Sequence, residues 1–526
     1  MRQVPFEGRI LVLGCGGVAR CTVPLLLKHL DMPSARITIM DMLDCRDALG
    51  DALDQGVQFV REQIVPDRYG EQLARFVGPG DMIVDLAWNI DCVDLLEWCH
   101  ARDVRYVNTS VELWDPYSDA DRKPPTERTL YVRHMAIRRL IESWANPRGA
   151  TAILEHGANP GLVSHFTKMG LLDLGRRLIA DRPGDRRAAP IAAAMAQEAF
   201  NRLAQLVGLK VIHISECDTQ STPRPVPPDE FVNTWSPEGF FEEAIAPAEM
   251  GWGTHERELP ADASRHAAGP QNQICLARCG MQTYVRSRVP SGEIIGMVIR
   301  HGESFSISEA LTVVENGQAV YRPTVHYAYF PCEAARISLE DLRARNYEFQ
   351  PAWRVMSNEI AAGSDELGCL LMGHDYKSWW TGSVLGIDEA RRLVPGQNAT
   401  TLQVAAAVMS AVIWMIRHPH EGVRLPDQLP HREIMDVALP YLGRVVSTPL
   451  DWSPGHDGDA AIVDSEPYAP ETWQFQRFLV QKPPRSTRRR TGRRAAKRLA
   501  AYDVLPVSAG KLAASLLDDH AHPGLE

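Results

Sequence analysis

The sequence contains no C-x-x-C pair and no apolar run long enough to cross a membrane. Its ten cysteines are scattered, and the closest two, Cys275 and Cys279, have no second cysteine pair or histidine pair near them, so we expect no metal site and no disulfide framework. The longest apolar run, Leu402 to Ile416, is interrupted by two polar residues and is shorter than the roughly 20 residues that a bilayer span needs. We interpret this run as a buried helix.

A signal peptide is also lacking. The N-terminus carries charge before its first apolar run, which has neither the length nor the cleavage site of a secretory signal. A chain of 526 residues with ordinary apolar content can bury large cores, and its length indicates two or three domains. We therefore predict a cytoplasmic globular protein that makes no membrane contact.

Acidic residues are absent from one long stretch near the C-terminus. Nine lysines and arginines lie between Lys482 and Arg498 without an acid among them, although the whole chain has a net charge of −10. This stretch has no apolar period, so residues 481–526 are predicted to form a basic tail that is disordered in isolation. The tail is the only candidate for nucleic-acid contact. We prefer a solvated extension, because no aromatic residue interleaves the basic run.

The first 150 residues carry the pattern of a dinucleotide-binding domain. A strand at 9–13 runs directly into Gly14-x-Gly16-x-x-Ala19 and then a helical pattern. Glycines in this position permit a tight turn and let backbone N–H groups approach a pyrophosphate at the helix N-terminus. A second strand, 36–41, ends in an acid where the ribose hydroxyls of NAD would be held, whereas Arg46 nearby leaves NADP open. The predicted NAD-binding residues are Gly14, Gly16, Gly17, Val18 and Asp41.

Further short apolar strands follow in the same region. They lie at 57–60, 82–86, 105–107 and 151–154 and are separated by segments long enough for crossover helices. Six candidate strands in this rhythm predict a Rossmann-like, doubly wound parallel sheet over residues 1–150.

After residue 150 the rhythm changes to strands with few crossover helices. Patterns at 210–215, 283–289, 293–300 and 319–329 predict a second, mixed α/β substrate domain over 151–385. Residues 386–480 are predicted to be C-terminal helices that pack on the other domains. The fold class is therefore α/β, and the substrate is expected between the second domain and the nicotinamide.

Polar residues cluster near the ends of the strands in this second domain. Glu216 and Asp218 end one strand, and His301 follows another. Trp235 lies in a turn-like segment, surrounded in sequence by Glu230, Glu238, Glu242 and Glu243. Each of these residues, taken singly, fits a capped loop or a satisfied core position as well as a catalytic one. The indole among carboxylates raises the question of what ligand would need both.

Several stretches, in order along residues 5–480, match one known family. They are Gly-Ala-Asn-Pro-Gly-Leu-Val-Ser (157–164), Ser-Glu-Cys-Asp-Thr-Gln (215–220), Glu-Phe-Val-Asn-Thr-Trp-Ser (230–236), Gly-Trp-Gly-Thr-His-Glu (251–256), Tyr-Arg-Pro-Thr-Val-His-Tyr-Ala-Tyr (321–329), Asp-Glu-Leu-Gly (365–368), Gly-His-Asp (373–375) and Gln-Asn-Ala-Thr (397–400). The chain resembles the bacterial homospermidine synthases, relatives of the saccharopine dehydrogenase group.

The resemblance implies a reaction that borrows a hydride. The family oxidises the terminal C–N bond of putrescine with NAD to an imine, a second putrescine displaces ammonia, and the new imine is reduced to homospermidine. Spermidine as donor would release diaminopropane instead, and the preferred donor stays open. The resemblance also implies a homodimer.

The resemblance also answers the question about Trp235. A diammonium substrate has no anionic group, so carboxylates, carbonyls and aromatic faces must recognise it, and a cation over an indole gains about 0.5 to 2 kcal/mol. An alkylammonium must also lose a proton before its carbon is oxidised; Glu216 is the first choice of base and His301 the second. By this resemblance the catalytic set is Glu216, Trp235, His301 and Asn159, and the substrate-binding set is Glu112, Asp218, Glu243 and Asp365.

Two other interpretations stay open at this point. Another imine-forming dehydrogenase of the saccharopine dehydrogenase type would bind a carboxylate, so its pocket should offer arginines where this chain shows mainly acids. A protein that binds NAD without turnover, with a tail that binds nucleic acid, is the alternative from a different class. A lysine Schiff base is disfavoured, because Lys168, Lys210 and Lys377 stand in no nucleophile motif.

Overall fold

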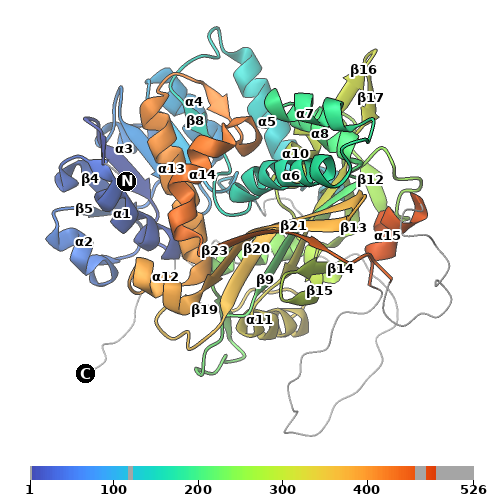
Figure 1. Cartoon of the computed structure of the whole chain (residues 1–526). Helices are drawn as coiled ribbons and strands as arrows, with labels where there is room; N and C mark the ends of the chain where they lie inside the picture. The colour runs from blue at the N-terminus through green and yellow to red at the C-terminus, as the bar shows by residue number, and fades with distance from the viewer. Residues whose placement is uncertain (1–2, 117–121, 456–469, 481–526) are drawn as a thin grey trace, which may run out of the picture.

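The structure is a computed structural model that describes residues 3–116, 122–455 and 470–480 (Figure 1). The predicted basic tail, 481–526, lies outside the described residues.

The N-terminal region forms a parallel sheet of seven strands in the order β22-β8-β7-β6-β2-β4-β5. All six predicted strands are present, so the prediction of a doubly wound parallel sheet is confirmed. The strands are β2 (Ile10–Leu13), β4 (Ile37–Asp41), β5 (Gln58–Arg61), β6 (Met82–Asp85), β7 (Arg105–Asn108), β8 (Ala152–Ile153) and β22 (Val423–Arg424). The central strands β2 and β6 are fully buried, which explains their continuous apolar sequences.

Helices follow the strands of this sheet. They are α1 (Gly17–His29), α2 (Gly50–Asp54), α3 (Tyr69–Ala74), α4 (Cys92–Ala101) and α5 (Leu130–Ser143). Helix α1 begins directly after the glycine-rich turn that ends β2. The carboxyl ends of β2, β4, β6 and β7 lie at the same edge of the sheet as the start of α1, and dinucleotides bind at this edge in folds of this type.

The second domain is built on a mixed sheet of ten strands. Its strands are β9 (Val211–Asp218), β11 (Pro247–Gly251), β12 (Ala263–Arg265), β13 (Gln273–Cys279), β14 (Tyr284–Val289), β15 (Gly292–Met297), β18 (Thr324–Phe330), β20 (Ser364–His374), β21 (Lys377–Gly386) and β23 (Arg444–Leu450). Strand β9 pairs parallel with β18 and antiparallel with β20. The mixed sheet that the sequence predicts is confirmed.

One predicted strand is divided. The pattern at 319–329 becomes β17 (Gln318–Tyr321) and β18, with Arg322 and Pro323 between them. Proline has no N–H to donate to a ladder, so a break at this point is expected. Strand β17 pairs with β16 (Val313–Glu315) in a separate hairpin, while β10 (Glu230–Asn233) pairs with β19 (Ala352–Val355).

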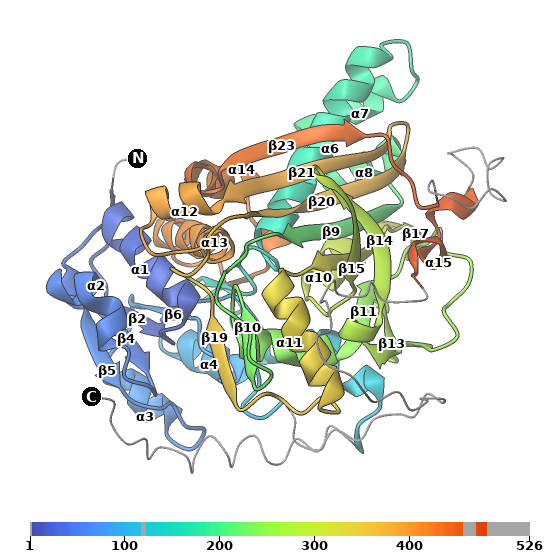
Figure 2. The ribbon, with the colours of Figure 1, turned by 90° about the horizontal axis from the view of Figure 1, so that it is seen from below.

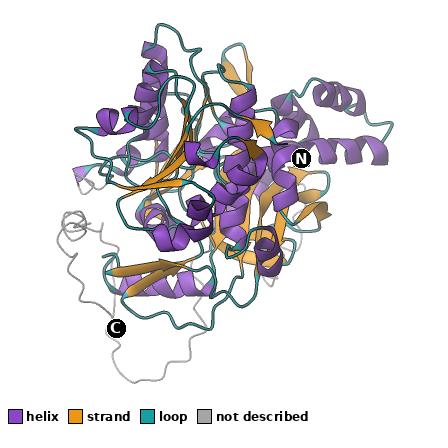
Figure 3. Ribbon diagram, turned by 90° about the vertical axis from the view of Figure 1, so that its left-hand side faces the viewer, coloured by secondary structure: helices purple, strands orange, loops and turns teal. Residues whose placement is uncertain are grey.

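Helices pack around and between the two sheets (Figure 3). In the second domain they are α6 (Leu162–Asp181), α7 (Ala188–Ala196), α8 (Phe200–Val207), α9 (Pro237–Ile245), α10 (Glu303–Ala310) and α11 (Glu333–Ala344). The C-terminal region adds α12 (Ile387–Leu393), α13 (Ala399–Arg417), α14 (His431–Ala438) and α15 (Phe475–Phe478).

The C-terminal region is not purely helical, in contrast to the prediction for 386–480. Strand β22 joins the edge of the N-terminal sheet beside β8, and β23 joins the second sheet beside β21. Two residues are too few to show a period in sequence, and Arg444–Leu450 alternates only weakly. The region therefore links the two sheets as well as covering them.

Helix α13 lies between the two sheets (Figures 1 and 2). It is the one helix among the described residues that is long and apolar enough to cross a membrane, yet 89% of its apolar window is buried inside the protein. The expectation of a buried helix at 402–416 is confirmed. Asn398 caps its N-terminus in a capping box with Thr401.

Candidate functional site

The glycine-rich turn has the backbone that a dinucleotide requires. Gly14 has a φ of +84°, and a Cβ there would lie 2.8 Å from the Leu86 carbonyl oxygen. Gly16 is the N-cap of α1, and a Cβ there would meet nothing within 4 Å. The turn is thus tight at Gly14 and open at Gly16, where a pyrophosphate would approach the helix N-terminus. Gly17 and Val18 begin the helix.

Asp41 lies at the end of β4 beside this turn. One of its carboxylate oxygens, Oδ2, accepts a hydrogen bond from the Cys15 N–H at 2.6 Å, and the other, Oδ1, accepts one from the Leu43 N–H at 2.8 Å. Arg46, the residue that left NADP open, forms an ion pair with Asp44 at 2.6 Å. The carboxylate next to the ribose position and the paired arginine fit NAD better than NADP.

Three buried carboxyl groups meet where β9 and β20 run side by side. Asp365 on β20 lies opposite Asp218 on β9, two residues from Glu216 on the same face of the strand. Asp218 accepts a hydrogen bond from Thr234 Oγ1 at 2.6 Å, and Asp365 accepts one from Thr400 Oγ1 at 2.6 Å. Burial raises the pKa of Asp218 to about 6, and burial together with the other two acids raises the pKa of Asp365 well above its usual value. These three groups form the acidic cluster.

Glu216 is held at the centre of a hydrogen-bond network. Its Oε2 accepts hydrogen bonds from Asn159 Nδ2 at 2.7 Å and from the Tyr327 hydroxyl. Burial raises the pKa of Glu216 to about 7, although these two donors favour the ionised form. The structure thus brings together Glu216 and Asn159, two of the predicted catalytic residues.

His301 joins this network through Tyr327. The two ring centroids lie 4.3 Å apart. The imidazole lies between two carboxylates, with Nε2 at 3.0 Å from Glu243 and Nδ1 at 3.1 Å from Glu303. Burial lowers the pKa of His301, but the two carboxylates outweigh burial and hold that pKa well above its usual value. The imidazole therefore keeps its proton at neutral pH.

Trp235 faces the same group of residues. Its indole Nε1 donates a hydrogen bond to the Tyr329 hydroxyl at 3.0 Å, and Tyr329 lies opposite Glu216 in the β9–β18 ladder. Phe240 packs against both rings. The indole is only partly buried. A partly exposed aromatic face next to buried carboxylates can receive an alkylammonium group.

The four carboxylates near Trp235 in sequence have four different neighbours. Glu230 forms an ion pair with Arg354, and Glu238 accepts a hydrogen bond from Ser236 at 3.2 Å. Glu242 is paired with arginines, whereas Glu243 contacts His301. Of the four, only Glu243 belongs to the network around Glu216.

Glu112 is not part of this network. It follows β7 at the carboxyl edge of the N-terminal sheet, where its Oε1 accepts a hydrogen bond from Ser110 at 2.7 Å. Burial, followed by the charge of Glu242, raises the pKa of Glu112 to about 8. Arg300, which also acts on Glu112, precedes His301 directly in the chain. Glu112 is thus connected to the rest of the predicted site through the charges of Glu242 and Arg300 and not through a hydrogen bond to Glu216 or His301.

The N-terminus of α13 connects the acidic cluster to the nucleotide turn. Thr400 donates to Asp365, and a Cβ on Gly17 would lie 3.2 Å from Thr401 Cγ2. Asn398 donates hydrogen bonds to the Thr234 and Met356 carbonyls, both at 2.7 Å. A substrate on the acidic cluster would therefore lie on the side of the second domain that faces the dinucleotide.

Comparison with known proteins identifies the family of this chain. The saccharopine dehydrogenase NADP binding domain matches residues 10–153, and the saccharopine dehydrogenase C-terminal domain matches 157–448. The homospermidine synthase of Blastochloris viridis is 38% identical over 90% of this chain and 98% of that protein, and that of Mesorhizobium japonicum is 36% identical over 90% and 96%. The chain belongs to the homospermidine synthase family.

A solved structure extends this comparison to the fold. The homospermidine synthase of Legionella pneumophila, crystallised in complex with NAD, is 36% identical and covers 91% of this chain and 99% of its own, with a TM-score of 0.79. The family assignment and the α/β fold class predicted from sequence are both confirmed.

Three residues of the site were missed in the sequence. Tyr327, Tyr329 and Thr400 contact Glu216, Trp235 and Asp365, respectively. The alternation of β18 places both tyrosines on one face, and this signal could have found them. The contact of Thr400 with Asp365 depends on packing between separate segments, which the sequence does not reveal.

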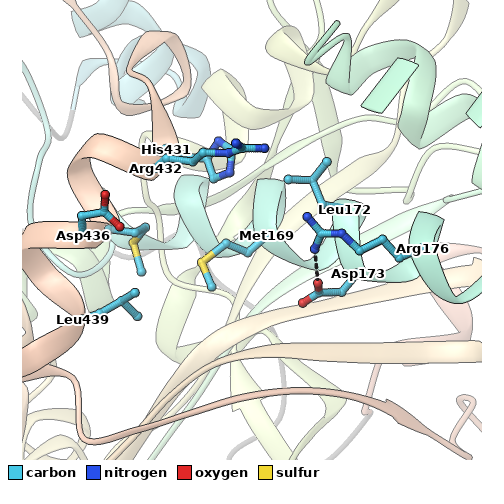
Figure 4. A pocket seen from close by; sticks show the side chains of 9 residues that line it. Met169, Leu172, Asp173, Arg176, His431, Arg432, Asp436 and Leu439 are labelled. Carbon is cyan, nitrogen blue, oxygen red and sulfur yellow. Dashed lines mark hydrogen bonds and ion pairs between the residues drawn. The ribbon is translucent and has the colours of Figure 1, made fainter. Parts of the chain in front are cut away.

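A surface cavity of about 230 Å³ lies between α6 and α14, and none of the predicted site residues lines it. Its lining includes Met169, Leu172, Met435 and Leu439, with the Arg176–Asp173 ion pair at its rim (Figure 4). The buried acidic cluster lies elsewhere in the fold, on β9 and β20.

Proposed function

We propose that this chain is an NAD-dependent homospermidine synthase, which transfers an aminobutyl group from putrescine or spermidine to a second putrescine. The observation that carries the proposal is the buried acidic cluster, to which Tyr329 links the indole of Trp235 and the N-terminus of α13 links the nucleotide turn. Three buried carboxyl groups favour a cationic substrate such as a diammonium compound, because a nearby positive charge stabilises their ionised form.

NAD would lie along Gly14, Gly16, Gly17 and Val18 with its ribose at Asp41, and when bound it supplies hydride acceptance and hydride return. The open space at Gly16 and the φ of Gly14 support this placement. The buried strands β9, β18 and β20 would exclude bulk water from the reacting carbon.

The substrate cation is proposed to lie against Asp218, Asp365 and the face of Trp235. Oδ1 of Asp365 is buried and lacks a hydrogen-bond partner in the described part of the chain, so one acceptor is free for an ammonium group. The raised pKa values of the acids fall when a cation binds, because a positive charge within a few ångströms favours the ionised form. Glu243 and Glu112 are proposed for the outer part of the pocket.

Glu216 is proposed as the base that takes a proton from the reacting nitrogen. A base must be unprotonated at the working pH, and a pKa of about 7 permits this for Glu216. His301 keeps its proton between Glu243 and Glu303, so its proposed role is to orient those carboxylates and Tyr327. Asn159 and Tyr327 fix the Glu216 carboxylate so that its second oxygen, Oε1, is available to the substrate.

Three other features stay predictions. A homodimer is proposed on the family resemblance, whereas a cytoplasmic location and the absence of a nucleic-acid partner are proposed on the sequence patterns of the N-terminus and the basic tail. Sedimentation velocity of the purified chain, with and without added RNA, tests the first and the third.

The proposed function is tested with purified protein, putrescine and NAD at a small fraction of the putrescine concentration. Mass spectrometry should find homospermidine and ammonia in amounts that exceed the NAD many times, with no net rise in NADH absorbance. NADH formed in step with substrate, without a longer polyamine, would contradict the proposal and indicate a plain dehydrogenase.

A further inference from the structure

Two buried arginines lie at the edge of the proposed substrate pocket. Arg133 on α5 and Arg300 after β15 both contact Oε1 of Glu242, Arg133 at 2.5 Å. The side chains of Arg133, Arg300 and Glu242 are 8%, 5% and 7% exposed. A second nitrogen of each guanidinium donates to a backbone carbonyl. Arg133 Nη1 donates to the Val111 carbonyl at 2.7 Å, and Arg300 Nη1 donates to the Arg128 carbonyl at 3.0 Å. We call these three side chains the arginine clamp.

Glu112 lies next to this clamp but is not bound by it. Its neighbour Val111 is held by Arg133, and both arginines act electrostatically on the Glu112 carboxyl group. Glu112 Oε2 is buried, and no hydrogen-bond partner for it exists among the residues that the structure describes. Burying an acceptor without a partner costs free energy unless a ligand completes it.

The charges of this group decide what that ligand is. An ammonium group that binds beside Glu112 favours the ionised form of this carboxyl group, whose pKa of about 8 otherwise keeps it protonated at neutral pH. The carboxylates of Glu112 and Glu242 then balance the two guanidiniums, and the Glu112 oxygen that has no partner among the described residues accepts from the ammonium group. Without the charge of Glu242 the cluster would be positive. Glu112 would then pair with an arginine, and the remaining guanidinium would attract a carboxylate.

We propose that Glu242 determines the charge specificity of the pocket: by occupying Arg133 and Arg300 together, it keeps Glu112 free for an ammonium group and prevents the arginines from binding a carboxylate. This inference rests on the proposed function in that the substrate is a diamine. It also explains how a pocket for diamines can contain the buried arginines that a carboxylate-binding relative would need. Glu242 acts through its neighbours and is a specificity-determining residue.

The test is Glu242→Gln in the full chain with NAD bound, assayed with putrescine and with 4-aminobutanoate, which carries a carboxylate in place of one ammonium group. We expect KM for putrescine to rise at least tenfold, with a smaller change in kcat. We also expect 4-aminobutanoate to become a competitive inhibitor of the variant at concentrations that leave the wild type unaffected. Damage to the fold alone would raise KM but would create no new affinity for a carboxylate.

Glu309→Gln is the matched control. Glu309 pairs with Arg138, which lies on α5 as Arg133 does, but its side chain is 33% exposed and it contacts none of the residues around Glu216. This variant should keep both KM and the insensitivity to 4-aminobutanoate. An unchanged KM and no inhibition in a folded Glu242→Gln, or the same changes in Glu309→Gln, would overturn the proposal.

Arg300→Gln provides a second variant in case Glu242→Gln does not fold, because it leaves Glu242 paired with Arg133. The cluster then becomes more negative, so KM for putrescine should stay within about twofold or fall, and 4-aminobutanoate should not inhibit. A tenfold rise in KM in this variant would show that the arginine clamp has a merely structural role, and would overturn the proposal.

Calorimetry with putrescine and glutarate separates the failure of the proposed function from the failure of this inference. A wild type that binds no putrescine contradicts the proposed function. Glutarate binding gained by Glu242→Gln still supports the role of Glu242 in charge specificity, and its absence overturns that role.

Discussion

At the scale of single residues, the Glu216 carboxyl group controls when the site can accept a proton. Burial raises its pKa to about 7, so its base form is gained as pH rises through that value. In the wild type kcat/KM, which reports the free enzyme, should therefore rise with pH through about 7. Glu216→Gln should lower kcat by roughly 10² to 10⁴ and remove this rising limb from the pH profile.

Glu256→Gln is the control for that profile. Burial also raises the pKa of Glu256 to about 7, but this carboxylate accepts hydrogen bonds from Thr324 and Phe475 and lies outside the predicted site. Its variant should keep the rising limb. A profile in which Glu216→Gln still rises through pH 7 would contradict the role of Glu216 as the base.

Trp235 provides two features that separate variants can distinguish. Trp235→Phe keeps an aromatic face but loses the hydrogen bond to Tyr329, and Trp235→Ala loses both. A cation–π contact of about 0.5 to 2 kcal/mol predicts that kcat/KM falls about 2- to 30-fold more in the alanine variant than in the phenylalanine variant. Steady-state kinetics with putrescine measure both; equal losses would show that the hydrogen bond alone matters.

The sequence predicted much of the site at this scale because polar residues end neighbouring strands. Glu216 and Asp218 share one strand face, and Asp365 meets them through a ladder whose register depends on long-range pairing. Glu242 and Glu243 are adjacent in sequence, but Glu242 binds arginines and Glu243 binds His301. This difference was not predictable. Helix α9 turns the two side chains toward different partners, and only the fold shows which.

At the scale of elements, the N-terminus of α13 holds the two domains and the site together. Asn398 caps the helix and also binds the carbonyls of Thr234 and Met356. Asn398→Ala should lower the free energy of unfolding by about 2 kcal/mol or more, since a cap alone contributes about 0.5 to 2 kcal/mol and two further buried carbonyls lose their donor.

Asp91→Ala is the comparison for α13, because Asp91 caps α4 through Val93 and Asp94 alone. Urea unfolding should show a smaller loss for this variant, about 1 kcal/mol. Equal losses in the two variants would contradict the bridging role of Asn398.

Elements with a strong period were predictable and short ones were not. The βαβ rhythm fixed six strands of the first sheet, because parallel strands buried on both faces read as apolar runs. Strands β22 and β23 were missed, since each is recruited by an edge strand from a distant part of the chain. Tertiary pairing rather than local preference places them.

At the scale of the whole molecule, the described part of the chain ends with a segment that closes the second sheet. Trp473, Phe475 and Phe478 are fully buried there. A chain truncated after residue 480 should keep wild-type polyamine turnover and melting temperature. A chain truncated after residue 469 loses all three aromatic side chains, at about 3 to 5 kcal/mol each, and should not fold. Loss of turnover in the longer truncation would show that the basic tail belongs to the enzyme.

The most direct test of the whole account follows the hydride. Putrescine deuterated at both carbons next to nitrogen is incubated with the protein, a small amount of NAD and an excess of unlabelled NADH, and the homospermidine is weighed by mass spectrometry. We predict that the product keeps every deuterium of its two precursors, because the hydride taken from a carbon returns to that carbon within one site. Product that lacks one deuterium, or no homospermidine at all, would contradict the account.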